Sequence, residues 1–230
     1  RYQRRLRTTI NGSVGYNMGT SLTKQLVENG GDLDWLGVDD GTRELPGGVP
    51  DEPLTTGGTL SSGNVTEAQL EAIGESFPDT LEPKERTIPL DYSGSISIRD
   101  KIEINESRRS FGFSTSLSYS DSWDYRERDR RSYEYAGDGN SRITSDYSSE
   151  FTSRDIDVSG LLDLVYNHNE QLSIESTSLL IRATDSVVDD YQGYYQPDNI
   201  YLGITEQYWV EQMLLHQAFE GTVGVNFWNE

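Results

Sequence analysis

The sequence predicts an all-β fold: a segment of an antiparallel up-and-down transmembrane β-barrel, with about six strands, long extracellular loops and one short loop helix. The first observation is a strict two-residue period, in which apolar side chains between Phe111 and Tyr119 alternate with small, mostly hydroxylated ones. The second is an alternation of long and short connections, because each rim of such a barrel holds one class of connection. The third is composition: 33% apolar residues are few for a large soluble core, whereas 14 tyrosines and 4 tryptophans argue against disorder.

The same period of two occurs in six segments of the 230-residue chain. The predicted strands cover approximately residues 2–17, 87–104, 109–135, 154–167, 171–184 and 206–228. Long loops, rich in polar residues and turn formers, are expected at approximately residues 18–86, 136–153 and 185–205. Within the first loop, Thr66 and Gln69 match a capping box, which predicts a short helix from Thr66 to Ser76.

One face of the predicted strands is apolar and is expected to face lipid, where unpaired polar groups are costly. The residues expected to face lipid are Leu6, Ile10, Val14, Ile96, Ile98, Phe111, Phe113, Leu117, Tyr119, Val158, Leu162 and Leu164. The short reversal at residues 105–108 marks the expected periplasmic end, and the end that carries Trp123 and Tyr125 is expected to be extracellular. A strand of a soluble sandwich would show the same alternation, but it rarely continues into a charged extension such as Arg126–Arg131.

Composition also argues against several classes of function. The chain has 39 acidic and 19 basic residues, a net charge of -20, which disfavours nucleic acid as a partner. It has no cysteine, so it forms no disulfide or thiolate metal site, and it has no apolar run long enough for a transmembrane helix. The two histidines, His168 and His216, are far apart, and no nucleophile-elbow, Walker or dinucleotide motif occurs. We therefore predict neither an enzyme nor a cofactor.

The candidate ligand-binding residues are acidic, basic and aromatic side chains assigned to the extracellular end. They are Trp35, Asp39, Asp40, Arg43, Trp123, Tyr125, Tyr194 and Tyr195. Aromatic rings in such loops stack on sugars or planar ligands, but tryptophan and tyrosine also belong at membrane interfaces. The run Arg126–Arg131 suits an anionic ligand or lipid phosphate, although its interleaved Glu127 and Asp129 favour a salt-bridged, solvated strand extension.

The acidic loop from Asp32 to Asp40 raises the question of calcium. It does not match an EF-hand, because Leu36 and Arg43 occupy the fifth and twelfth positions, where oxygen ligands are required. A solvated loop, or one held by Arg43, is the favoured interpretation, and a nonstandard calcium site is the alternative. We assign no metal site.

Three runs of sequence resemble a known family. They are GGDLDWLGVDDGTRELP (Gly30 to Pro46), ESFPDTLEPKERTIPLDYSGSISI (Glu75 to Ile98) and SLSYSDSWDYRERDRRSYEY (Ser116 to Tyr135). In this order and spacing they resemble the early barrel region of TonB-dependent outer-membrane receptors, in the branch whose first loop has the pattern DWLGxDDGxRxLP.

The resemblance implies a bacterial outer-membrane barrel of about 22 strands, closed by an N-terminal plug and energised through TonB. Such receptors capture and import scarce nutrients, for example a siderophore–metal complex or a carbohydrate. We expect this sequence to hold only about six of those strands and neither the plug nor the TonB-contacting segment. The expected partners are outer-membrane lipid, a small-molecule ligand, the remaining strands and plug, and the TonB complex through an N-terminal part absent from this sequence.

Two other functions fit the same patterns. One is a soluble or secreted β-rich domain that binds carbohydrate or mediates adhesion, and the other is a segment of a passive porin without a plug. An open six-stranded sheet has two unpaired edges and an apolar face, so we expect the isolated chain not to be a stable soluble monomer.

Overall fold

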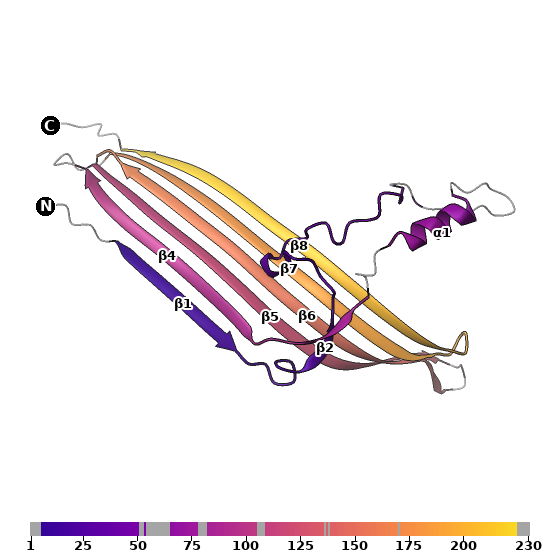
Figure 1. Ribbon diagram of the computed structural model, residues 1–230. Coiled ribbons are helices and arrows are strands. Elements are labelled where there is room, and N and C mark those ends of the chain that lie inside the picture. Colours follow the sequence, from indigo (N-terminus) through magenta and orange to yellow (C-terminus); the bar gives the residue numbers. More distant parts are fainter. Residues whose placement is uncertain are drawn as a thin grey trace.

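The computed structural model describes residues 6–50, 53, 65–77, 82–104, 109–135, 137, 139–169 and 171–224. It contains one antiparallel sheet whose six strands have the order β1-β4-β5-β6-β7-β8 (Figure 1). These strands are β1 (Arg7–Gly15), β4 (Asp91–Ile104), β5 (Arg109–Tyr135), β6 (Ser141–Asn167), β7 (Leu172–Tyr195) and β8 (Ile200–Val223). Each strand pairs with the next along the sheet, so the prediction of an all-β, up-and-down arrangement is confirmed.

Residues 16–90 connect β1 to β4 and are here called the insert. Its strands β2 (Lys24–Val27) and β3 (Lys84–Thr87) pair with each other, and a short 3-10 turn, η1 (Asp34–Leu36), lies between them in the chain. The predicted helix is present as α1 (Glu67–Glu75). Its capping box is complete: the Gln69 N–H donates to the Thr66 hydroxyl, and the Thr66 N–H donates to the Gln69 side chain. No helix among the described residues is long and apolar enough to cross a membrane.

The predicted loops at 136–153 and 185–205 are wrong, because the strands continue through most of both segments. Only residues 136–140 separate β5 from β6, and residues 196–199 separate β7 from β8, so long and short connections do not alternate. In these extensions polar and aromatic side chains occupy both faces, and the hydrophobic period therefore disappears while backbone pairing continues. β6 and β8 accordingly begin earlier than predicted, and β7 ends later.

Two further strand boundaries differ. β4 begins at Asp91 instead of residue 87, because residues 84–87 pair with β2 inside the insert. Of the predicted first strand, residues 2–5 lie outside the described residues, as do residues 225–228 of the last and the reversal at 105–108.

The strand register places the predicted lipid-facing residues on one face of the sheet, except Leu6, which precedes β1 and has no register partner. Direct partners share a face, and one row of partners crosses all six strands: Ile10, Ile96, Leu117, Gly160, Leu180 and Leu215. No part of the described chain covers this row, since Ile10 is 73% exposed, Leu117 59% and Leu215 72%. We call one part of this face the apolar band. It extends from the row that contains Phe111 and Tyr166 to the row that contains Tyr119 and Val158, both rows included.

The opposite face carries Leu161 and Val165 on β6, but many of its side chains on β1, β4, β5 and β6 are small and polar. Their hydroxyls hydrogen-bond across strands, with Ser13 and Ser93 2.7 Å apart and Ser118 and Ser159 also 2.7 Å apart. The distinction between the faces weakens on β7, where Leu179 and Ile181 lie on the polar face and Ser176 and Ser178 on the apolar one.

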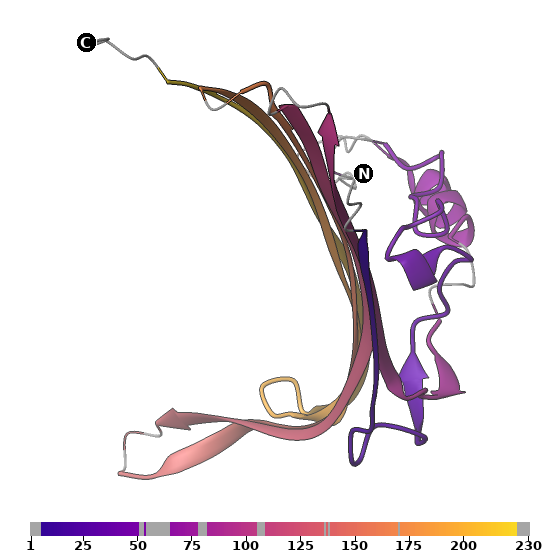
Figure 2. The ribbon, with the colours of Figure 1, turned by 90° about the vertical axis from the view of Figure 1, so that its left-hand side faces the viewer.

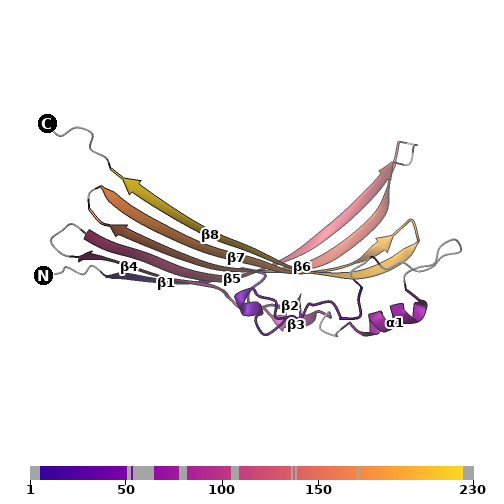
Figure 3. The ribbon, with the colours of Figure 1, turned by 90° about the horizontal axis from the view of Figure 1, so that it is seen from above.

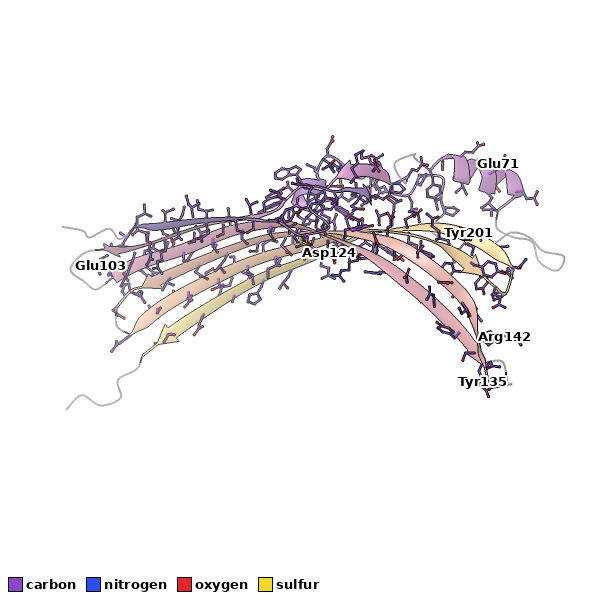
Figure 4. All side chains as sticks on the ribbon, turned by 90° about the horizontal axis from the view of Figure 1, so that it is seen from below. Glu71, Glu103, Asp124, Tyr135, Arg142 and Tyr201 are labelled. Carbon is purple, nitrogen blue, oxygen red and sulfur yellow. The ribbon has the colours of Figure 1, made fainter. Side chains whose placement is uncertain are left out.

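The sheet is curved, and the insert lies against its convex face (Figures 2 and 3). This is the face of the apolar band, but the insert covers its continuation on β5, β6 and β7. Val27, Ile88 and Trp123 form a buried cluster there. Beyond the insert the β5–β6 hairpin bends away from β7–β8 (Figure 3), and Tyr135 and Arg142 lie near its tip, far from Tyr201 on β8 (Figure 4).

Candidate functional site

The insert docks where β5 extends beyond the end of its neighbour β4. From Trp123 onward, one edge of β5 lacks a partner strand, and Asp91 at the start of β4 together with two residues of the insert supplies hydrogen bonds for that edge. The Trp123 N–H donates to the Asp91 carboxylate at 2.9 Å, and the Trp123 carbonyl accepts from Asn17 at 3.2 Å. The Tyr125 N–H donates to the Thr20 hydroxyl at 3.0 Å. These bonds satisfy backbone groups that would otherwise be orphaned at a covered edge.

Arg43 organises the acidic loop of the insert. Its guanidinium donates two hydrogen bonds to Asp34, at 2.9 and 2.7 Å, one to Asp39 at 3.1 Å, and one to Glu28. It also lies over the ring of Trp209 on β8, 3.6 Å from the ring centroid. Burial alone would lower the pKa of Arg43, but the bonds with Asp34 and Glu28 raise it above its ordinary value. The acidic loop is therefore held by Arg43, as the favoured interpretation expects.

We call Arg43 and its partners Glu28, Asp34 and Asp39 the ion cluster. Glu211 connects this cluster to β8. Its carboxylate accepts from the Trp209 indole at 2.9 Å and from the Asp39 N–H at 2.5 Å, and it forms an ion pair with Arg182. Burial acts to raise the pKa of Glu211, but these hydrogen bonds outweigh it and the pKa lies below its ordinary value. Glu211 therefore remains charged and joins the insert to two strands.

The sequence DWLG forms the turn that meets β7. Gly37 ends η1 in the left-handed region, with φ of 65°, and its carbonyl accepts from the Thr184 hydroxyl at 2.8 Å. A Cβ at this position would lie 2.5 Å from that hydroxyl, so close approach and backbone conformation both require glycine. Ser186, on the same face of β7, donates to Glu28 at 2.8 Å.

A cavity of about 280 Å³ lies between the insert and the sheet. Its lining includes Trp35, Trp123, Glu28, Asp32, Arg86, Arg154, Thr152 and Val188. Trp123 is only 8% exposed, and its indole nitrogen has no hydrogen-bond partner among the described residues. Arg154 is neutralised by Asp121 through two bonds of 3.1 and 2.6 Å. Aromatic walls with compensated charges suit a small polar molecule better than a lone ion.

A second cavity, of about 360 Å³, lies on the opposite, concave face of the extended hairpins. Tyr147 and Tyr191 form an edge-to-face pair there, with ring centroids 5.9 Å apart. The Tyr191 and Tyr208 hydroxyls donate to Glu206 at 2.8 and 2.7 Å, and these bonds lower the pKa of Glu206. Arg130 completes this part of the lining, so the cavity offers rings, an anion and a cation to a ligand.

The structure brings together four of the predicted ligand-binding residues. Trp35 and Trp123 line the first cavity, and Asp39 and Arg43 form the ion cluster beside it. Asp40 instead shapes the loop, accepting from the Asp32 and Thr42 N–H groups at 2.8 and 3.2 Å.

Three predicted residues do not join this site. Tyr125 follows Trp123 on the same face, but its hydroxyl donates to Glu127 at 3.3 Å. Tyr194 and Tyr195 lie at the far end of β7, where Tyr194 donates to Asn199 in the turn at 2.6 Å. No local sequence pattern singled out Glu28, Arg154 or Glu211, which meet their partners only through sheet register and insert docking.

The described residues contain no group of three or more histidine, aspartate or glutamate side chains placed to hold a metal ion. In comparisons with known proteins, no family model, curated protein or solved structure matches the chain.

Proposed function

We propose that this chain is part of the wall of an outer-membrane β-barrel receptor that captures a scarce nutrient and imports it. The observation that carries the proposal is the exposed apolar band opposite a hydroxylated face. On β5 the band runs from Phe111 to Tyr119, nine residues, or about 27 Å of strand. A tilted strand needs about 9 to 11 residues to cross the hydrocarbon layer. In a barrel the convex, apolar face would meet lipid and the concave face would line the lumen.

Aromatic side chains at both ends of the band support a membrane location. Phe111 and Tyr166 are register partners at one end. At the other end the Tyr92 and Tyr119 rings stack with centroids 5.7 Å apart, and Trp35 lies 6.5 Å from Tyr119. Bacterial barrels carry such aromatic girdles at the two borders of the hydrocarbon layer.

Two charged side chains interrupt the band: Asp100, the register partner of Phe113, accepts from the Lys101 N–H at 2.8 Å, and Arg182, the partner of Val158, forms an ion pair with Glu211, although its Nε has no partner among the described residues. Uncharged polar side chains on the same face of β7 and β8 find partners locally. Gln217 accepts from Ser178 at 2.5 Å and donates to Ser176 at 3.1 Å. Such closed hydrogen bonding is expected where water is absent, because an unpaired polar group in hydrocarbon is costly.

Ligand capture is assigned to the concave face of the strand extensions, beyond the band. The cavity around Tyr147, Tyr191 and Glu206 offers stacking surfaces and charged hydrogen-bonding groups to a small ligand such as a siderophore–metal complex or a carbohydrate. The free edges of β1 and β8 would pair with the remaining strands of the barrel. Import would in addition require a plug and the TonB complex, as the resemblance to the receptor family implies.

Cysteine labelling in whole cells tests this proposal, because the chain has no native cysteine. In the full-length protein, with any cysteine elsewhere replaced, Leu117→Cys should resist a charged maleimide, whereas Ser116→Cys should react from the aqueous lumen. Arg128→Cys, on the extension, reports exposure at the cell surface. Equal reaction of Leu117→Cys and Ser116→Cys would contradict a lipid-facing band.

A soluble carbohydrate-binding domain is the second candidate, favoured by the tryptophan-lined cavity under the insert. The apolar band argues against it, because soluble monomers rarely expose such large contiguous apolar surfaces.

A further inference from the structure

Trp35 lies at the border of the apolar band. Its backbone carbonyl accepts a hydrogen bond from the Tyr119 hydroxyl at 2.6 Å, and the two rings are 6.5 Å apart. Leu117 is the β5 residue of the band's central row. Tyr119 lies in the next row and pairs with Gly94 and Val158. In the row after that, Asp121, Ile156 and Thr184 are all buried. Trp35 thus marks the transition from an exposed apolar face to a face that the insert covers.

The side of the sheet on which Trp35 lies is equally informative. The insert rests on the convex face, the same face that carries the band (Figure 2). A lipid layer that covers the band up to Tyr119 would therefore meet the edge of the insert at Trp35. A ligand in the barrel lumen would lie on the other side of the sheet.

The turn that carries Trp35 is held firmly, although its ring is not buried. Asp34 is fixed by two bonds from Arg43, and the carbonyl of Gly37 by Thr184. Trp35 as a residue is nevertheless 54% exposed. Indole combines a large apolar surface with one N–H donor, and this combination favours the headgroup layer of a membrane over both water and hydrocarbon.

We propose that Trp35 is a membrane-interface anchor, by which the insert rests in the headgroup layer of the lipid that surrounds the barrel. This inference rests on the proposed function. In this proposal Trp35 contacts lipid instead of a captured ligand. The insert lies on the outer surface of the barrel wall. The ion cluster of Arg43 then holds Trp35 at a fixed position next to the Tyr119 end of the band.

The test uses the full-length receptor labelled with 5-fluorotryptophan and reconstituted in phosphatidylcholine vesicles. The variants Trp35→Phe and Trp123→Phe assign two fluorine resonances, one from the anchor and one from a buried control. Leu117→Trp adds a reporter within the band, and Leu162→Trp is a second such reporter in case the first variant does not fold. Lipids that carry a nitroxide on the headgroup or in the middle of the acyl chain then broaden nearby fluorine signals.

We expect the headgroup nitroxide to broaden the Trp35 resonance at least threefold more than that of Trp123, and the mid-chain nitroxide to broaden the band reporter. If the band reporter is broadened but Trp35 responds no more than Trp123, the anchor is refuted and the barrel wall stands. If neither responds to any lipid nitroxide, both the anchor and the proposed function fail.

Discussion

Asp155 and Asp185 are direct partners across β6 and β7, and their carboxyl groups share a hydrogen bond on the concave face. Local desolvation raises the pKa of Asp155, and so do Asp185 and the nearby Asp157 and Asp124, bringing it to about 6 from 3.8. Two ionised carboxylates at this spacing would repel each other, so the pair is most favourable when it holds one proton. Asp155 lies outside the apolar band, three residues beyond Val158.

This pair predicts a pH dependence of stability. The folded chain binds the proton more tightly than the unfolded chain, so stability should fall as pH rises from about 4 to about 6 and stay low above that. Asp155→Asn should remove this loss and stabilise the fold at pH 8 by about 1 kcal/mol, a reduced value because water reaches the side chain. Denaturant unfolding in detergent at pH 4 and pH 8 measures the difference. A variant that is equally stabilising at both values would refute the shared proton.

The ion cluster predicts how the insert is held. Arg43→Ala would leave Asp34 and Glu28 buried without their partner, at a cost of about 3 kcal/mol. We expect the insert to detach locally, so amide exchange at residues 18–50 should accelerate at least tenfold while the apolar band remains protected. Arg43→Lys should fall in between, because an ammonium cannot form the paired bonds to Asp34. Unchanged exchange in Arg43→Ala would show that the insert is held by other contacts.

Gly37 predicts a steric effect at the same junction. Gly37→Ala would strain a left-handed residue and place a methyl group against Thr184, at a cost of about 2 kcal/mol in docking of the insert. Gly48→Ala is the matched control, because its added Cβ would meet nothing within 4 Å. Limited proteolysis should cut the insert faster in the first variant only. Equal protection of the two variants would mean that the turn relaxes without loss.

How much the sequence predicts differs between the band and its extensions. The alternation around Leu117 identified the strands and the apolar face. A strand with lipid or a protein core on one face and water on the other needs apolar and polar residues in alternation. The capping box of Thr66 identified α1 from local contacts alone. The predicted loops failed because paired backbone needs no hydrophobic period once both faces are polar, as around Tyr147 and Tyr191.

The site was harder to predict than the fold. Trp35, Trp123 and Arg43 stood out as unusual side chains in a polar setting, and the structure brings them together. Glu28, Ser186 and Glu211 are ordinary polar residues in their own segments. They became contacts only when β7, β8 and the insert met, which no local pattern specifies. The four-residue strands β2 and β3 are likewise too short to show a period.

The most direct test of the proposed barrel wall compares two neighbouring residues on β5. Leu117 lies in the central row of the apolar band, and Ser116 faces the opposite side. Unfolding of the full-length protein from lipid vesicles should show Leu117→Arg destabilised by about 2 to 4 kcal/mol, because in the proposed barrel a charge would enter hydrocarbon. Ser116→Arg, facing an aqueous lumen, should lose less than about 1 kcal/mol. Equal losses at the two positions would contradict a membrane barrel and indicate a soluble sheet instead.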